Sequence, residues 1–301
     1  MYKKSENVTF GLVKQRGGMK MKRIIQCFLL VFIVFMAPTV VAHAENGVGI
    51  SDNQNGTVTV KYENDGKKKI AVIVKKDGAS NQYQYIFEPK KNVNVVIPMT
   101  SGNGTYTVSV LKNIEGTKYS PLSSAEVSLT LKDSKSSYLT SNEMIKWSKK
   151  NAAIKRANAI AKKYKGQLNK IKGIYKYLVT NYHYDYKKFE KNSSGKLGYY
   201  TPNINTTYKT KKGICYDMSA LTASMLRSIG VQTKMITGYP DNRYFDGESY
   251  HAWNKLYSKD KKRWMIIDVT CDMCLYEQGV PYKKLVMSKK ASEYSNVKYE
   301  Y

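Results

Sequence analysis

The strongest constraint on the fold is the way the hydrophobic periodicity changes along the chain. Between residues 46 and 132, apolar and polar residues alternate in short segments, and Gly, Asn, Asp and Pro separate these segments. A period of two is typical of strands with one buried face, and turns about every 8–12 residues are typical of a sandwich. We therefore expect an all-β domain over residues 45–132. Its strands are predicted at residues 57–60, 70–74, 83–87, 93–97, 106–111 and 127–131.

The segment 104–110, Gly-Thr-Tyr-Thr-Val-Ser-Val, refines this expectation. It resembles the late strand of an immunoglobulin-like sandwich, in which a Tyr braces the corner between two strands. The domain contains no Cys, no His and no evident cluster of carboxylates. We expect an immunoglobulin-like sandwich that is a spacer or a binding module, without catalytic residues.

A polar linker at residues 132–137 ends this domain, and the apolar period then becomes 3.6. Thr140 and Glu143 match a helix-capping box, which predicts a helix over residues 144–164. Similar apolar spacing predicts two further helices, at residues 168–178 and 213–229.

The last two of these helices are separated by a long loop, residues 185–212, that is rich in Tyr, Lys, Asn, Ser and Gly. Loops of this length inside a compact domain are often functional. After the third helix the period returns to two, which predicts strands over residues 231–238, 250–257 and 264–269. The last two strands are expected to form an antiparallel hairpin. Helices followed by such strands predict an α+β domain over residues 138–301.

The first 44 residues have the composition of an export signal. A positively charged segment at residues 20–23 precedes an apolar run at residues 24–36, and Ala-His-Ala ends at Ala44. The apolar run is too short for a transmembrane helix. We expect cleavage after Ala44, and a mature protein that is secreted or associated with the cell surface but is not an integral membrane protein. Residues 1–18 are interpreted as an extension upstream of the true start codon.

The formal net charge of +27 comes almost wholly from Lys, because only six of the 50 basic residues are Arg. Lys is a point charge without the planar fork that reads nucleic-acid bases. This composition favours diffuse attraction to anionic cell-envelope polymers over specific binding of nucleic acid. An AT-rich genome would produce the same excess of Lys, and both interpretations stay open.

Three residues form a candidate catalytic constellation. Cys215 lies at the predicted start of the helix over residues 213–229, where free N–H groups and the helix dipole favour a thiolate. His251 lies near the start of one strand of the expected hairpin, and Asp268 lies near the end of the other. These two positions can be neighbours across an antiparallel pair. Each residue alone is more often structural, but together they supply a nucleophile, a base and an orienting acceptor.

The number of Cys residues supports this interpretation. Cys215, Cys271 and Cys274 follow the predicted cleavage point, which leaves an odd number in a compartment where paired Cys oxidise. Cys215 is the natural one to be free.

Residues 140–275 resemble the transglutaminase-like superfamily, whose core is a rearranged relative of the papain fold. The resemblance rests on the residue types, order and spacing of segments 174–178, 181–185, 213–217, 225–231, 238–239, 250–254 and 268–270. It implies an α+β core in which Cys215 attacks a carboxamide or peptide carbonyl. His251 would protonate the leaving amine, and Asp268 would hold the correct His251 tautomer.

The same resemblance implies what the enzyme acts on. The acyl group would come from a protein or peptide substrate and pass either to an amine, which gives a crosslink, or to water, which gives hydrolysis. The oxyanion would be met by the Cys215 backbone N–H and a second donor. Tyr208 is a candidate for that donor, and a surface Tyr without this role is the alternative.

Cys271 and Cys274 depart from the family pattern, because many relatives carry an aromatic residue after Asp-Val-Thr. The pair could form a local disulfide, act as a redox pair or supply half of a metal site. A disulfide is expected in an exported protein. A zinc site lacks ligands, since only His183 is left over. We therefore expect no metal and no cofactor.

Two function classes remain after these steps. The first is an exported thiol acyltransferase or hydrolase that acts at the cell envelope. The second is a catalytically silent scaffold or binding protein that keeps the fold without using the three residues. The presence of all three, Cys215, His251 and Asp268, favours the enzyme.

Overall fold

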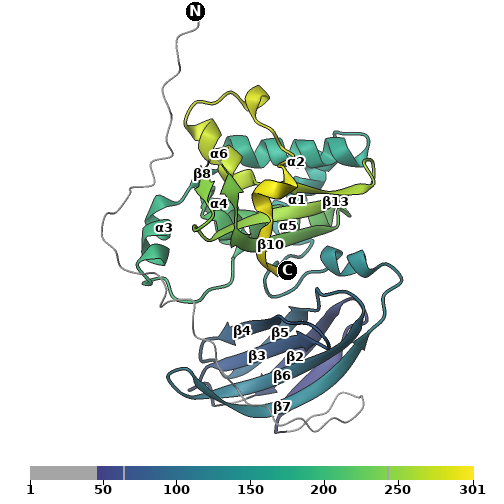
Figure 1. Ribbon diagram of the computed structural model, residues 1–301, viewed down its shortest axis with the longest axis vertical. Helices are drawn as coiled ribbons and strands as arrows, with labels where there is room; N and C mark the ends of the chain where they lie inside the picture. Colours follow the sequence, from purple (N-terminus) through teal and green to yellow (C-terminus); the bar gives the residue numbers. More distant parts are fainter. Residues whose placement is uncertain (1–45, 64, 243) are drawn as a thin grey trace, which may run out of the picture.

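The computed structural model describes residues 46–63, 65–242 and 244–301, and it has the mixed α+β architecture expected from the sequence (Figure 1). The expected signal peptide, its cleavage after Ala44 and the upstream extension lie outside these residues. Within the described part of the chain, no helix is long and apolar enough to cross a membrane.

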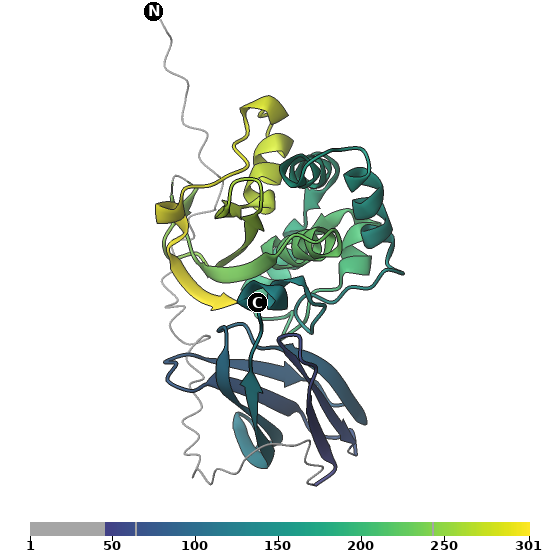
Figure 2. The same cartoon turned by 90° about the vertical axis from the view of Figure 1, so that its right-hand side faces the viewer.

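The N-terminal region is a two-layer sandwich of antiparallel strands. One sheet has the order β1-β2-β5 and the other β4-β3-β6-β7. Both packed layers are visible in Figures 1 and 2. The strands are β1 (Val48–Asp52), β2 (Thr57–Glu63), β3 (Ile70–Lys76), β4 (Gln82–Phe87), β5 (Asn92–Pro98), β6 (Gly104–Glu115) and β7 (Lys118–Leu129).

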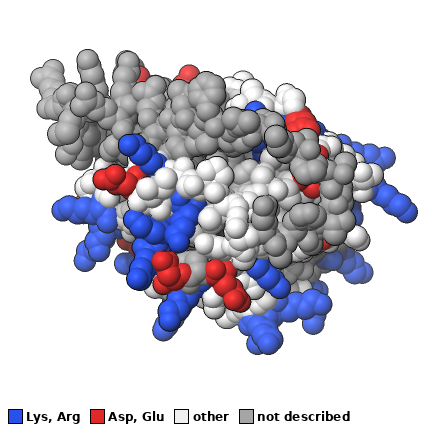
Figure 3. All heavy atoms as spheres, turned by 90° about the horizontal axis from the view of Figure 1, so that it is seen from below, with Lys and Arg blue, Asp and Glu red and all other residues white. Residues whose placement is uncertain are grey.

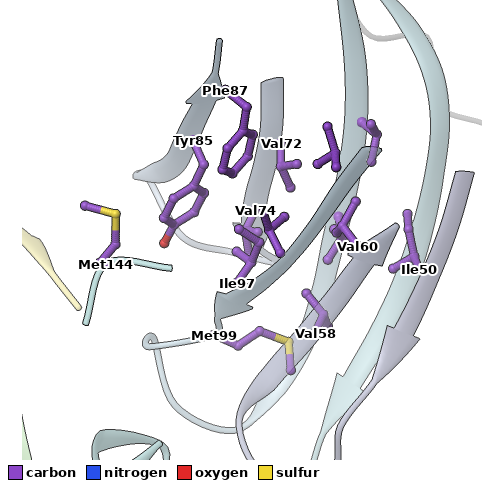
Figure 4. Close-up of a cluster of buried hydrophobic side chains, with 14 of the residues drawn as sticks. Ile50, Val58, Val60, Val72, Val74, Tyr85, Phe87, Ile97, Met99 and Met144 are labelled. Atoms are coloured by element: carbon purple, nitrogen blue, oxygen red, sulfur yellow. The ribbon is translucent and has the colours of Figure 1, made fainter. Parts of the chain in front are cut away.

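Alternation places the β-branched residues of these strands between the two sheets. Val58 and Val60 of β2 face Val72 and Val74 of β3, and all four are buried (Figure 4). The Tyr106 hydroxyl donates to the Gly102 carbonyl oxygen, which is the corner bond expected of an immunoglobulin-like strand. The six predicted strands are therefore confirmed, and β1 is an additional one.

The helix predicted over residues 144–164 is wrong in its first half. A 3-10 helix, Ser134–Leu139, follows the sandwich, and α1 spans only Ala152–Ala161. The Asn142 side chain accepts hydrogen bonds from the backbone N–H groups of Met144 and Ile145, which holds the chain in a turn. This turn carries both apolar side chains to the sandwich, so burial there outweighs the local capping signal.

The C-terminal region consists of helices packed on an antiparallel sheet of order β14-β13-β10-β15. The predicted hairpin is present, because β13 pairs with β14. The main elements are α2 (Gln167–Asn181), α5 (Cys215–Ser228), β10 (Thr233–Tyr239), β13 (His251–Ser258), β14 (Arg263–Ile267), α6 (Val269–Glu277) and β15 (Asn296–Glu300). The shorter ones are β8 (His183–Tyr184), β9 (Lys212–Gly213), β11 (Asp241–Asn242), β12 (Phe245–Asp246), and the 3-10 helices η3 (Tyr282–Lys284) and η4 (Ala291–Tyr294).

The segment expected to be a long loop, residues 185–212, instead contains two short helices, α3 (Tyr186–Ser193) and α4 (Ile204–Thr210). Asp185 and Asn203 cap them, since each side chain accepts backbone N–H groups of the first turn. Strong local capping therefore orders a segment whose apolar content is low.

Helix α5 is the centre of the molecule. Every residue from Asp217 to Arg227 is buried, and the helix packs against β10 and β13. Ala220 and Ala223 belong to the hydrophobic cluster of the sandwich, whereas Met218 and Leu221 belong to that of the helical layer. Small residues on one face let α5 lie close to both layers, which explains why it is buried all around.

The sandwich and the C-terminal region are joined through the turn after the linker. Glu143 N–H donates to the Val96 carbonyl oxygen at 2.7 Å, and the Tyr138 hydroxyl donates to the Thr100 carbonyl oxygen at 2.7 Å. Tyr85 of β4 points from the sandwich toward Met144 (Figure 4). Strand β15 runs down toward the sandwich, where the Thr100 hydroxyl donates to its Glu300 carbonyl oxygen (Figure 2).

Candidate active site

The backbone places Cys215 at the first position of α5. Gly213, two residues before Cys215, lies in β9, which pairs in parallel with β8. A Cβ at Gly213 would come within 2.8 Å of the Asp217 Cβ, so only glycine allows this close approach. Asp217 Oδ2 accepts the Ile214 N–H at 3.1 Å and completes the N-terminal cap. Cys215 itself is half-buried, so its sulfur lies at the positive end of a helix and stays reachable.

The structure brings His251 and Asp268 together. His251 begins β13, and Asp268 directly follows β14 as the N-cap residue of α6. His251 Nε2 lies 2.8 Å from Asp268 Oδ2, and both side chains are buried. The hairpin register, in which Asn254 faces Ile267, puts the two residues at the same end of the sheet.

His251 also interacts with Cys215. Because Nε2 is engaged by Asp268, the other ring nitrogen, Nδ1, is the one available to the sulfur. Burial lowers the pKa of His251, but the negative charges of Asp268 and Cys215 outweigh it and raise that pKa to about 10. The arrangement therefore favours a protonated imidazolium beside the Asp268 carboxylate.

Asp268 is held as a carboxylate. Burial raises its pKa. The charge and hydrogen bond of His251, together with the hydrogen bond from the Cys271 N–H, lower the pKa by more, so its net value is below the usual one. Oδ1 accepts the Cys271 N–H at 2.9 Å, and Oδ2 also accepts the Tyr294 hydroxyl at 2.9 Å. Sequence patterns gave no signal for Tyr294, because it lies in the short 3-10 helix η4, 26 residues beyond Asp268.

Tyr208, predicted as an oxyanion donor, lies in a different cluster. Its ring is 3.8 Å from Lys211 Nζ, and its hydroxyl interacts with Tyr177. The Lys211 ammonium also donates to the Tyr182 hydroxyl at 3.0 Å. These contacts turn Tyr208 toward α2, and they do not support its predicted role.

Tyr200, from the same segment between α2 and α5, lies at the first turn of α5. Its ring stacks edge-on against Tyr216 with a centroid separation of 5.6 Å, and Lys188 Nζ lies 4.1 Å from its centroid. Burial, then Asp217 and Cys215, raises its pKa, so the phenol stays protonated. Its buried hydroxyl interacts with the Asp217 carboxylate, although without a hydrogen bond of ordinary geometry within the described residues. In a Tyr-rich segment, the sequence offered no way to choose Tyr200.

The disulfide expected between Cys271 and Cys274 is absent. Both residues lie in α6 as free, buried thiols. Burial raises the pKa of both thiols well above the usual range, which keeps them protonated and poorly nucleophilic. The helix that Asp268 caps therefore uses both Cys residues as small apolar core side chains. In the part of the chain that the structure describes, no three His, Cys, Asp or Glu side chains gather as metal ligands.

Part of the chain matches a known protein family. Residues 154–269, which contain all three candidate residues, match the transglutaminase-like superfamily. They form a transglutaminase-like core. A UPF0252 protein of Methanocaldococcus jannaschii is 28% identical over 157 residues, 48% of this chain and 44% of that protein. The chain thus spans less than half of the length of this curated relative.

Two solved structures are also similar to the chain. The first is a transglutaminase, with a TM-score of 0.32 and 20% identity over 39% of this chain and 31% of that one. The second is a proposed cysteine protease from Cytophaga hutchinsonii, with a TM-score of 0.38 and 15% identity over 81% of this chain and 80% of that one. A transglutaminase-like core suggests thiol acyl transfer or hydrolysis as the class of chemistry.

Proposed function

We propose that this chain is a thiol acyltransferase or hydrolase in which Cys215, His251 and Asp268 form a catalytic triad. One observation carries the proposal: buried His251 binds Asp268 through Nε2 and interacts with the sulfur of Cys215 at the first position of α5. Nucleophile, base and orienting carboxylate are thus within reach of one another in one site.

The first half of the reaction makes a thioester. The Cys215 thiolate attacks the carbonyl carbon of a glutamine side chain or a peptide bond, and the carbonyl oxygen takes up the electron pair. His251, which starts as an imidazolium, gives its proton to the departing nitrogen, and ammonia or an amine leaves. Asp268 keeps the ring in place and stabilises its positive charge.

The second half releases the acyl group. Neutral His251 accepts a proton from an incoming amine or water, whose nitrogen or oxygen attacks the thioester carbon. The thiolate of Cys215 leaves, and the product is a new amide or a carboxylic acid. An amine gives a crosslink and water gives hydrolysis, so the product reports which acceptor reaches the site.

We assign two donors to the oxyanion. The Cys215 N–H belongs to the first turn of α5, in which the N–H groups lack helical partners. The Tyr200 hydroxyl is protonated, buried and adjacent to the same turn. Together they form the oxyanion site, with Tyr200 taking the role that the sequence pattern suggested for Tyr208.

We further propose that the enzyme is exported and acts on proteins or peptides at the cell envelope. The sandwich and its surface charge would hold it there. Lys and Arg outnumber Asp and Glu on the face seen in Figure 3. A surface hollow of about 450 Å³ is lined by residues that include Lys67, Lys68 and Lys112, with Asp65 as the acidic member. Such a surface attracts phosphate-rich or other anionic polymers.

The test is a single assay on the purified protein. A glutamine-containing peptide is incubated with and without a primary amine, and its mass is followed. We expect deamidation or cleavage without the amine, an amine adduct with it if crosslinking is the activity, and none of these with the variant Cys215→Ala.

The variant Cys271→Ala is the matched control, because it removes a free thiol of the same domain that is buried and protonated. It should turn over at the wild-type rate when corrected for folded protein. Turnover by Cys215→Ala that equals the wild-type rate would refute the proposal, and so would a wild-type thiol that iodoacetamide labels no faster than a free cysteine.

A further inference from the structure

The segment beyond residue 269, outside the family match, reaches back to the triad. Helix η4 ends at Tyr294, whose side chain is 3% exposed. Its hydroxyl donates to Asp268 Oδ2 at 2.9 Å. A residue 26 positions downstream thus contacts the carboxylate that holds the catalytic histidine.

The contact completes the set of donors around Asp268. Oδ1 accepts the Cys271 N–H at 2.9 Å, whereas Oδ2 accepts from both His251 Nε2 and the Tyr294 hydroxyl. The three donors come from three different elements, α6, β13 and η4. Rotation of the carboxylate about its Cβ–Cγ bond would break all three bonds, so its orientation toward His251 is fixed.

The Tyr294 ring is itself fixed by aromatic packing. It contacts Trp253 edge-on with centroids 5.2 Å apart, and Trp253 stacks on His251 at 6.3 Å and 18°. Phe245 covers His251 with a centroid separation of 4.4 Å. Rings on several sides restrict both the histidine and the tyrosine that act on Asp268.

The backbone around η4 is anchored on both sides. Before it, Lys289 N–H donates to the Ile266 carbonyl oxygen at 2.8 Å. After it, β15 pairs with β10, and the Asn296 carbonyl oxygen comes so close to Gly238 that a Cβ there would lie only 2.2 Å away. Glycine at 238 therefore permits the approach that holds the segment carrying Tyr294.

We propose that Tyr294 is a positioning residue of the triad, whose hydroxyl fixes the Asp268 carboxylate and takes up part of its negative charge. The inference rests on the proposed function of Cys215, His251 and Asp268. Tyr294 touches neither the sulfur nor the substrate carbonyl, and it acts on the reaction through Asp268 and His251.

The charged neighbours allow the direction of the effect to be predicted. Asp268 faces His251 and Lys289, and Asp272 lies nearby with an ion pair to Lys289 Nζ at 2.6 Å. Burial and Asp268 raise the pKa of Tyr294 far above its usual value, so it is a neutral donor at every pH of interest. Without the Tyr294 hydroxyl, Asp268 Oδ2 carries more negative charge beside His251. The imidazolium is then stabilised and becomes harder to deprotonate.

The test compares Tyr294→Phe, which keeps the ring, with the control Tyr138→Phe. Tyr138 is also buried and its hydroxyl also makes one hydrogen bond, but to the Thr100 carbonyl oxygen away from the triad. The first measurement is the NMR titration of the His251 ring in a Cys215→Ser background. The chain has only three His residues, and His183→Asn removes the signal of the exposed one.

We expect Tyr294→Phe to move the His251 midpoint upward by about half a pH unit, since one hydrogen bond to the carboxylate is lost. In the enzyme with Cys215 intact, kcat should fall about tenfold with little change in KM. The alkaline limb of the pH–rate profile should move to higher pH, as the His251 midpoint does. Tyr138→Phe should change neither measurement.

A His251 midpoint that stays in place or falls in Tyr294→Phe would overturn the proposal, and so would equal effects of the two variants. The titration needs no turnover. If wild-type protein proves inactive on the peptide, the proposed function fails while the link from Tyr294 to His251 is still decided by the titration.

Discussion

The two regions of the molecule bury different kinds of polar groups. In the described strands of the sandwich and their turns, the buried polar side chains are neutral hydroxyls: Thr57, Thr100, Ser109 and Ser123. In the C-terminal region they include ionisable groups: Asp217, Arg227, His251, Asp268 and Asp272. A buried hydroxyl with a partner costs little, whereas a buried charge costs several kcal/mol unless it is paired.

Every one of these buried charges has partners. Asp217 pairs with Lys188 at 2.7 Å, and Asp272 with Lys289 at 2.6 Å. Arg227 donates to three backbone carbonyl oxygens, at 2.7 to 2.9 Å, from the turn after the linker, β10 and the last residue. The sandwich is thus stabilised by apolar packing, and the C-terminal region by packing around a network of charges. The proposed catalytic residues His251 and Asp268 belong to this network of charges.

The largest effect is expected from Asp268→Ala. It leaves His251 without its hydrogen-bond partner and its counter-charge, so kcat should fall by roughly 10³- to 10⁴-fold. Asp268→Asn is the matched variant, since its amide oxygen can still accept from Nε2. It should lose kcat by a comparable factor, because a neutral amide cannot stabilise the imidazolium, and the alkaline limb of its pH–rate profile should shift to lower pH. Steady-state rates measured against pH give both effects. Equal activity of Asp268→Ala and wild type would show that this buried carboxylate has no part in catalysis.

Substitutions in the core of the sandwich should lower the free energy of unfolding and leave kcat unchanged. Ile70 of β3 is 1% exposed, and Ile70→Ala should lower the free energy of unfolding by about 2–5 kcal/mol. Ile114→Ala is the control, because this side chain is 55% exposed and its loss should change stability by less than about 0.5 kcal/mol. Urea unfolding gives both values. A lower kcat per folded molecule in Ile70→Ala would show that the sandwich takes part in catalysis.

Local patterns predicted most of the fold and the central part of the site. Alternation located the six predicted strands of the sandwich, and the hairpin register brought His251 to Asp268. These predictions succeed because periodicity and pairing depend on neighbours in sequence or on adjacent strands.

The errors come from contacts between distant segments. The helix predicted from the Thr140 capping box does not begin until Ala152, because Met144 and Ile145 gain more burial in the sandwich. Tyr200 and Tyr294 were missed because only the folded chain brings them to Cys215 and Asp268. No local pattern separates them from the other tyrosines, of which the chain has 26 in total.

Tyr200→Phe tests which tyrosine of the C-terminal region is the second oxyanion donor. Losing one of two oxyanion donors should lower kcat by roughly 10- to 100-fold with little change in KM, at or below the usual loss for one donor. Tyr208→Phe is the control, because that hydroxyl lies with Tyr177 and Lys211. Steady-state kinetics on the glutamine peptide separate the two variants. If Tyr208→Phe were the slower one, the assignment of the donor would be reversed.

The smallest effect concerns stability against pH, where the two regions should again differ. The pKa of folded His251 is about 10, above its ordinary value near 6.5, because the charges of Asp268 and Cys215 outweigh burial. Its contribution to stability is therefore fully present below about pH 6.5 and is lost as the pH rises toward 10. Wild type should lose more stability over this window than His251→Asn does, as measured by urea unfolding. A slope unchanged by His251→Asn would mean that the charge of this buried histidine is not coupled to the folding of the C-terminal region.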